Sequence, residues 1–436
     1  MQTSIFSKAF CGSGKLSQTI ACFLHGQKRT TLRAQYIMSN RRPSIFAELS
    51  PLPSNLSDVP ADGINLSVET YRDKNGKPYP LPVVRLIEKQ LAHDQTIDHD
   101  YLDNALGFAP FVEQSTRLLF NTIYNNVKDN VSAVQSVSST GAIRLGFEFM
   151  FRVLNCENVM ISNPTYSDYD LIAKNAGIPI LQEYPYYDYE NRKLAFEPML
   201  HCLSQAKSNS IVVLQIGHNP TGLDPTYSQW RQIAEVIKDR NLIPFFDVAN
   251  VGLCSGSVVD DTAPLKLFVD LEIEFFVAQS FSKNFGLYNE RVGTLIVFSQ
   301  DKSKMAEIKQ YLHNIARSIY TNPPIHGARI VTRILQANYY KQQWAVEVQM
   351  IYKRTMAMRK ALRQQLEEKQ TPGTWNHLTD SHGLFVLLGL NDEQLHYLTK
   401  KYNIYTGTSG RINVSMLNEK NIERIASAID DAARSS

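Results

Sequence analysis

A lysine followed eight residues later by an arginine is the pair of side chains in this chain best suited to chemistry. Lys283 comes shortly after an apolar run, residues 275–278, and precedes a loop that contains Gly286 and then Arg291. A lysine that reacts with a carbonyl group needs surroundings that lower its pKa, and the end of a buried strand provides them. Arg291 adds a planar, permanently charged donor for a phosphate. The spacing predicts amine chemistry on a phosphate-bearing carbonyl cofactor.

Two other polar residues also follow apolar runs. Asn219 comes after residues 211–216, and Asp247 comes after residues 242–246. Strands that alternate with helices form parallel or mixed sheets, in which ligands bind beyond the carboxyl ends of the strands. We therefore expect Asn219, Asp247 and Lys283 to lie at one edge of a sheet.

A helix is predicted between the first two of these runs. Thr226 and Gln229 form a potential capping box at its start. Apolar residues then recur at helical spacing on one face: Trp230, Ile233, Ala234 and Ile237. A second helix is predicted over residues 142–153, directly after Ser138, Ser139 and Thr140, whose N–H groups and hydroxyls can bind a phosphate at a helix N-terminus.

The pattern changes near residue 345, and this change predicts the domain organisation. Long charged helical segments follow, such as 346–369, then short strands near 383–389 and 410–414 and a last helix over 420–434. We predict a large domain of residues 92–345, a smaller domain of residues 48–91 and 346–436, and an N-terminal arm of residues 1–47.

The composition disfavours several classes of protein, including membrane-spanning and nucleic-acid-binding proteins. No apolar stretch is long enough to cross a membrane, and the five scattered cysteines contain no C-x-x-C pair, which favours a reducing compartment and no metal cluster. Residues 1–47 carry seven basic and no acidic side chains, although the whole chain has a net charge of only +3. The remainder is mildly acidic and does not attract nucleic acid. The basic segment before Met38, residues 1–37, has the composition of a mitochondrial transit peptide or of a disordered tail.

The segment SFSKNFGLYNERVG (280–293) resembles the Schiff-base motif of the aspartate aminotransferases. Other segments are similar to that family in the same order: SSTGA (138–142), HNPTGLDPT (218–226), YTNPP (320–324), TPGTWNH (371–377) and SGRINV (409–414). The resemblance extends from about residue 45 to the end of the chain. It implies an α/β fold of the fold type I pyridoxal-phosphate-dependent transferases, with a mostly parallel seven-stranded sheet flanked by helices and a smaller α+β domain.

The resemblance also implies roles for single residues around pyridoxal phosphate. Lys283 would hold the cofactor as a Schiff base and then transfer the proton, and Asp247 would pair with the ring nitrogen. Other contacts to the cofactor are implied for Ser138, Ser139, Thr140, Tyr166, Asn219, Asn250, Ser280, Arg291 and, from a neighbouring subunit, Tyr101.

Two arginines would select the substrate. Arg411 matches the family residue that binds the α-carboxylate, and Arg317, 34 residues after Lys283, matches the one that binds the distal carboxylate across a dimer interface. Asn219 and Tyr166 would also contact the substrate. These matches imply a homodimer acting on small amino acids and 2-oxo acids.

Four residues depart from the family pattern near the site. Asn250 replaces a tyrosine that donates to the cofactor, although an asparagine amide can donate too. Glu69 replaces a glycine, where it would repel a dicarboxylate, pair with Arg411, or point outward and do neither. Ser139 replaces a glycine of the phosphate loop, and Tyr169 replaces a histidine that supports Asp247.

The sequence therefore predicts a transaminase that converts L-aspartate and 2-oxoglutarate to oxaloacetate and L-glutamate, by ping-pong kinetics through pyridoxamine phosphate. The departures leave two alternatives open. One is a transaminase with preference shifted towards aromatic or sulfur amino acids, and the other is a cofactor-binding homologue with little activity. The resemblance is nearest to the animal cytosolic form, which predicts a cytoplasmic protein, or a mitochondrial one if residues 1–37 are a working transit peptide.

Overall fold

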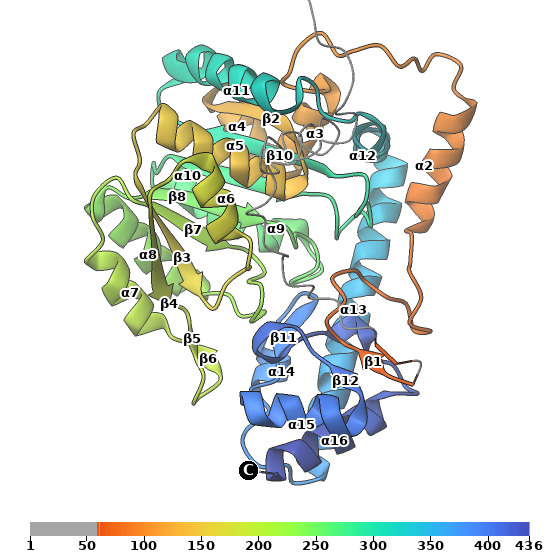
Figure 1. Ribbon diagram of the computed structural model, residues 1–436. Coiled ribbons are helices and arrows are strands. Elements are labelled where there is room, and N and C mark those ends of the chain that lie inside the picture. Colours follow the sequence, from red (N-terminus) through yellow and green to blue (C-terminus); the bar gives the residue numbers. More distant parts are fainter. Residues whose placement is uncertain (1–58, 61, 436) are drawn as a thin grey trace, which may run out of the picture. The chain divides into compact units, whose positions relative to one another are not determined.

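The computed structural model describes residues 59–435 apart from residue 61, and its largest sheet has seven strands with helices around it (Figure 1). The strand order is β2-β10-β9-β8-β7-β3-β4, and of these seven strands β10 alone runs antiparallel to its neighbours. In that order the strands are Val131–Val137, Val292–Phe298, Phe275–Ser280, Ile243–Val248, Ile211–Gln215, Asn158–Asn163 and Ile180–Pro185. The predicted mostly parallel sheet is confirmed, whereas the predicted arm, residues 1–47, lies outside the described residues.

Helices cover both faces of the sheet, so its central strands are apolar on both sides. In β8, Phe245 packs into the hydrophobic cluster on one face and Phe246 into the cluster on the other. The first face is covered by α5 (Ser138–Arg152), α6 (Tyr169–Ala176) and α11 (Met305–Tyr320). The other is covered by the end of α3 (Ala109–Phe120) and by α7 (Phe196–Ser204), α8 (Tyr227–Arg240) and α10 (Ala263–Asp270).

Helix α8 begins where the capping box predicts. The Thr226 hydroxyl accepts the N–H of Gln229 at 3.3 Å, and the Gln229 side chain accepts the N–H of Thr226 at 2.9 Å. The four apolar residues of the predicted face, Trp230, Ile233, Ala234 and Ile237, are all buried.

Two predicted helix starts are wrong. Helix α5 begins at Ser138 rather than at residue 142, so the Ser-Ser-Thr segment forms its first turn instead of preceding it. Helix α13 (Asn338–Glu368) begins eight residues before the predicted 346, because Trp344 packs into the same cluster as α12 (His326–Gln336) and extends the helical packing towards the N-terminus.

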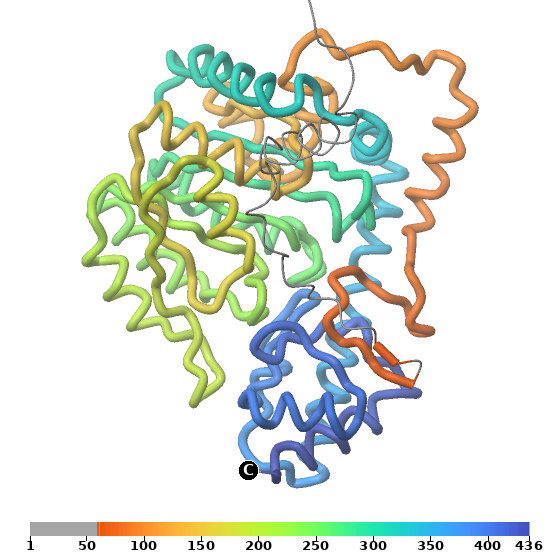
Figure 2. Tube along the Cα trace, in the orientation of Figure 1, coloured from red at the N-terminus to blue at the C-terminus, as the bar shows by residue number. Residues whose placement is uncertain are grey.

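The C-terminal segments form a separate cluster with residues near 64. Strand β1 (Ile64–Asn65) pairs in parallel with β12 (Ile404–Tyr405), so these distant segments lie side by side (Figure 2). Strands β11 (Phe385–Leu387) and β13 (Arg411–Asn413) pair in antiparallel fashion. The packing is completed by α14 (His377–Asp380), α15 (Asp392–Tyr402) and α16 (Ile422–Arg434).

Helix α2 (Pro82–His93) packs elsewhere, against α12 and α13. The remaining α-helices among the described residues are the short α4 (Tyr124–Val127) and α9 (Val258–Asp261). The division into domains at residues 91 and 345 stays a prediction, and α13 runs through the second of these positions. No helix among the described residues combines the length and apolar character that a membrane crossing requires.

A buried histidine after β7 gives the fold a pH dependence. His218 stacks on Tyr186 with ring centres 3.7 Å apart, and burial lowers its pKa from 6.5 to about 3, although Asp224 opposes this shift. Below pH 6.5 the unfolded chain takes up a proton that the folded chain does not bind, so stability falls as the pH falls. Between pH 7.5 and 5.5 the wild type should lose roughly 1.4 kcal/mol more free energy of unfolding than His218→Asn. Denaturant titrations at both pH values measure this difference, and equal losses would contradict it.

Candidate active site

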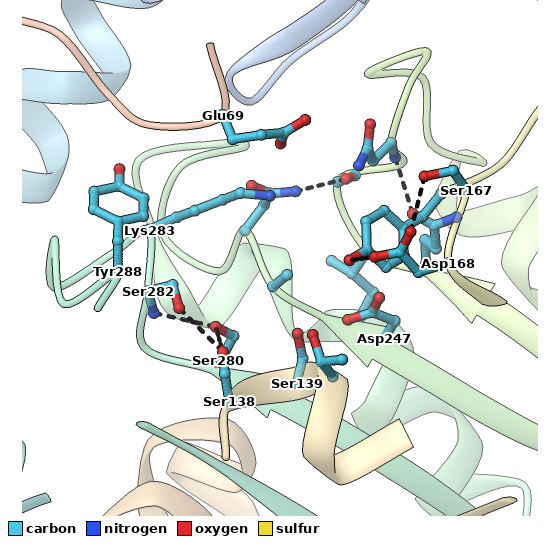
Figure 3. Close-up of a pocket in the computed structure, with 18 of the residues that line it drawn as sticks. Glu69, Ser138, Ser139, Ser167, Asp168, Asp247, Ser280, Ser282, Lys283 and Tyr288 are labelled. Atoms are coloured by element: carbon cyan, nitrogen blue, oxygen red, sulfur yellow. Dashed lines mark hydrogen bonds between the residues drawn. The ribbon is translucent and has the colours of Figure 1, made fainter. Parts of the chain in front are cut away.

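A pocket of about 340 Å³ lies beyond the carboxyl ends of β7, β8 and β9 (Figure 3). Asn219, Asp247 and Lys283 all line it, as predicted, although Asp247 lies within the last two residues of β8 rather than after the strand. Most of the other predicted cofactor contacts line it too: Ser138, Ser139, Thr140, Tyr166, Asn250, Ser280 and Arg291.

Lys283 enters the pocket from the loop after β9. Its ammonium nitrogen lies 4.8 Å from the centre of the Phe385 ring. Burial lowers the pKa of Lys283, the carboxylates of Glu69 and Asp247 raise it, and the nearby Arg411 lowers it again. A lysine with a lowered pKa is a better nucleophile near neutral pH, in line with the chemistry predicted from the sequence.

The residue after Lys283 fixes the loop that carries it. Asn284 is buried, and its side-chain N–H donates to the Val251 carbonyl at 3.1 Å. The Asn284 carbonyl accepts the indole N–H of Trp344 at 2.8 Å. The position of Lys283 is therefore set by the loop after β8 and by α13.

Asp247, the second-to-last residue of β8, has one carboxylate oxygen with a hydrogen-bond partner and one without. Its Oδ2 accepts the hydroxyl of Tyr169 at 2.7 Å, whereas its Oδ1 is buried without a hydrogen-bond partner. Burial raises the pKa of Asp247, and the Tyr169 hydrogen bond and Lys283 counteract that effect. A buried carboxylate oxygen without a partner fits a ligand that presents a protonated ring nitrogen.

Removing the Tyr169 hydroxyl is expected to weaken cofactor binding. Tyr169→Phe takes away the hydrogen bond that favours the charged form of Asp247, at a cost of about 1–3 kcal/mol, which corresponds to roughly 5- to 150-fold in affinity. Titration of the cofactor-free protein, followed by absorbance, measures the affinity. Tyr184→Phe is the matched control because Tyr184 is also a buried tyrosine, and its hydroxyl donates to the Val213 carbonyl. Equal affinities in the two variants would contradict the role of Tyr169.

Three serine hydroxyls meet at the N-terminus of α5. The Oγ of Ser138 lies 3.0 Å from the Oγ atoms of both Ser280 and Ser282 (Figure 3). Arg291 donates to Ser282 Oγ at 3.3 Å and to the Tyr288 carbonyl at 2.9 Å. Hydroxyls, a guanidinium and the free N–H groups of a helix N-terminus together fit a phosphate.

Close backbone packing between β10 and the start of α5 brings Ser138 next to Arg291. Gly293 in β10 lies against Ser138, and a Cβ on Gly293 would come within 2.5 Å of the Ser138 backbone. Ser138 also donates its N–H to the Arg291 carbonyl at 3.0 Å. Any larger residue at 293 would push the start of α5 away from Arg291.

Several residues that line the pocket were not singled out from the sequence: Ser167, Asp168, Gln215, Ser282 and Tyr288. Ser282 had a detectable signal, because it lies two residues after Ser280 and directly before Lys283. No local pattern marks Asp168, because it belongs to the site through its contact with Tyr166, whose hydroxyl donates to the Asp168 carboxylate at 2.6 Å.

The Asn250 side chain is partly engaged within the protein. Its side-chain N–H donates to the Gly217 carbonyl at 2.8 Å, and its Oδ1 is buried without a partner. One of the two amide N–H groups that could have replaced the tyrosine hydroxyl is therefore already used within the protein.

Arg411 lies beside the pocket and contacts two of the residues that line it. It donates from Nη1 to Asn219 Oδ1 at 3.1 Å, and from Nη2 to the Glu69 carboxylate. Its guanidinium lies 4.6 Å from the centre of the same Phe385 ring that Lys283 contacts. The ion pair that the sequence left as one option for Glu69 is present.

Two predicted residues lie away from the pocket of their own chain. Tyr101 is 86% exposed, and Arg317 is exposed near the end of α11. Neither lines the pocket. Their predicted contribution to a neighbouring subunit's site stays a prediction.

Comparison with known proteins agrees with this geometry. The family model "Aminotransferase class I and II" matches residues 61–429. The cytoplasmic aspartate aminotransferase of Caenorhabditis elegans is 39% identical over 85% of this chain and 91% of its own length.

Two solved structures have the same fold. The cytoplasmic aspartate aminotransferase of Saccharomyces cerevisiae has a TM-score of 0.85 at 33% identity, covering 89% of this chain and 98% of that one. The aromatic-amino-acid aminotransferase of Burkholderia pseudomallei, covalently bound to pyridoxal phosphate, has a TM-score of 0.85 at 31% identity, covering 90% of this chain and 100% of that one. The chain belongs to the class I and II aminotransferases, and it is a transaminase whose cofactor is pyridoxal phosphate.

Proposed function

We propose that this transaminase transfers the amino group of L-aspartate to 2-oxoglutarate, giving oxaloacetate and L-glutamate by a ping-pong mechanism. The observation that carries the proposal is the convergence in one pocket of Lys283, the unpaired oxygen of Asp247 and the serine–arginine group at the start of α5. The substrate pair is supported by relatives that are named aspartate aminotransferases.

The cofactor would be held at both ends. Its phosphate would be bound by Arg291 and the serine hydroxyls, and its ring nitrogen by Asp247. The remaining proposed contacts are Ser139, Thr140, Tyr166, Asn219 and Asn250, with Tyr101 from the partner subunit. When bound, pyridoxal phosphate supplies an aldehyde for the substrate amine and a ring that stabilises the negative charge left when the Cα proton departs.

The protein's own residues would then control proton transfer. Among the described residues that line the pocket, Lys283 is the one lysine. Its lowered pKa suits an amine that takes up a proton and returns it. Asp247 would keep a proton on the ring nitrogen, since its negative charge favours the protonated form.

Substrate binding would require two arginines and two subunits. Arg411 would bind the α-carboxylate, and Arg317 of the partner would bind the distal carboxylate, so the active unit would be a homodimer. Asn219 and Tyr166 would contact the substrate from the same subunit as Lys283. We also propose a cytoplasmic location, in keeping with the cytoplasmic relatives.

Two other functions have specific support. A preference for aromatic or sulfur amino acids is favoured by Glu69, which places negative charge at the pocket, and by the similarity to an aromatic-amino-acid aminotransferase. Weak turnover is favoured by Asn250, which stands where the family has a tyrosine and has one of its two amide N–H groups bonded to the Gly217 carbonyl.

Steady-state kinetics of the cofactor-loaded protein separate these possibilities. Aspartate, phenylalanine and methionine are each offered as donors with 2-oxoglutarate as acceptor. We expect aspartate to give the highest kcat/KM and parallel double-reciprocal plots. A higher kcat/KM for another donor would favour shifted specificity, and no turnover with any donor despite bound cofactor would favour the inactive homologue.

A further inference from the structure

The backbone around Glu69 is held against the strand that carries Arg411. Asn413 is buried, and its side-chain N–H groups donate to the carbonyls of Val68 at 2.7 Å and Thr70 at 2.9 Å. These two residues flank Glu69, and Asn413 lies two residues after Arg411 in β13. The backbone of Glu69 is therefore held in a fixed position, from which its side chain reaches Arg411.

Both terminal nitrogens of Arg411 already have partners within the chain. Nη1 donates to Asn219 and Nη2 donates to Glu69. A carboxylate ligand that binds an arginine through two parallel hydrogen bonds needs two of its N–H groups. A guanidinium has five N–H groups, so a ligand can still find free donors on Arg411, but where it approaches Nη2 it has to compete with the Glu69 carboxylate.

Glu69 is the partner that is easier to displace. Its side chain is 56% exposed, whereas that of Arg411 is 15% exposed. An exposed carboxylate can turn into water at little cost, since ion pairs at the surface contribute about 0–1 kcal/mol. Glu69 therefore competes with ligands for Arg411 and does not block the site permanently.

We infer that Glu69 is a specificity-determining residue that occupies Arg411 as an internal carboxylate and weakens the binding of carboxylate ligands. Figure 3 shows its carboxylate projecting into the pocket that also contains Lys283. The inference rests on the proposed function insofar as Arg411 is the carboxylate site. It concerns small mono- and dicarboxylates, each of which would compete with the Glu69 carboxylate for Arg411.

Binding of succinate to the cofactor-loaded protein tests the inference without turnover. Succinate carries two carboxylates and no amino group, and isothermal titration calorimetry measures its affinity. We expect Glu69→Gln to bind succinate about fivefold more tightly than the wild type, which corresponds to roughly 1 kcal/mol, because the neutral amide competes less well for Arg411.

Two controls make the result specific. Glu113→Gln changes the charge in the same way in an exposed pair with Arg117 on α3 and should leave succinate binding unchanged. Adding Arg411→Met to Glu69→Gln should abolish the gain. An affinity of Glu69→Gln that equals or falls below that of the wild type would overturn the inference, and so would a gain that survives without Arg411.

The test separates this inference from the proposed function. If no amino acid is turned over but Glu69→Gln still tightens succinate binding through Arg411, the proposed substrates are wrong and the role of Glu69 stands. If aspartate is turned over but succinate binding does not depend on Glu69, the inference about Glu69 is wrong and the proposed function stands.

Discussion

Replacing Lys283 by alanine is expected to lower kcat for amino transfer by roughly 10²–10⁴-fold, the usual contribution of a general acid–base group. The variant loses the amine with the lowered pKa in the pocket, and the remaining pocket residues do not replace it. It should still bind the cofactor without a covalent bond, since Arg291 and the serines at the start of α5 remain.

Lys266→Ala is the control for this change. Lys266 lies on the exposed side of α10 and pairs with Asp270, so the same substitution there should leave kcat unchanged. Steady-state measurements of kcat on both variants and the wild type, with cofactor content checked by absorbance, give the comparison. A kcat of Lys283→Ala within tenfold of the wild type would contradict the role assigned to Lys283.

Replacing Arg359 by methionine is expected to destabilise the fold by about 3–5 kcal/mol, because it leaves several buried carbonyl groups without donors. Arg359 is 1% exposed, and burial lowers its pKa to about 9. Its guanidinium donates to a single segment of the chain, through the carbonyls of Leu378, His382, Gly383 and Phe385 and the hydroxyl of Ser381. That segment leads into β11, whose Phe385 ring contacts both Lys283 and Arg411.

Lys360→Met is the matched control, because Lys360 is the next residue of α13 and is exposed. It should change the free energy of unfolding by less than about 0.5 kcal/mol. Denaturant unfolding of the two variants and the wild type measures the difference. A loss below about 1 kcal/mol in Arg359→Met would mean that the carbonyl groups find other donors.

Much of the site could be predicted from local sequence, because parallel strands place their ends at one edge. Asn219, Asp247 and Lys283 each follow a short apolar run, and that position alone brought them together. The start of α8 could also be predicted, since a capping box is a local pattern between Thr226 and Gln229.

The missed features depend on contacts between distant residues. Hydroxyl-rich segments favour both loops and helix caps, so the start of α5 at Ser138 could not be distinguished from a preceding loop. Whether Glu69 points outward or pairs with Arg411 depended on packing between segments 342 residues apart in the chain. The use of the Asn250 amide by Gly217 likewise depends on how the loops after β7 and β8 meet.

The central claim is that Lys283 binds pyridoxal phosphate covalently, and chemical trapping tests it most directly. The purified protein is loaded with cofactor, reduced with borohydride, digested and analysed by mass spectrometry. We predict that the peptide containing Lys283 alone gains the mass of the reduced phosphopyridoxyl group, and that Lys283→Ala gains none. A modification on another lysine, or one that persists in Lys283→Ala, would contradict the claim.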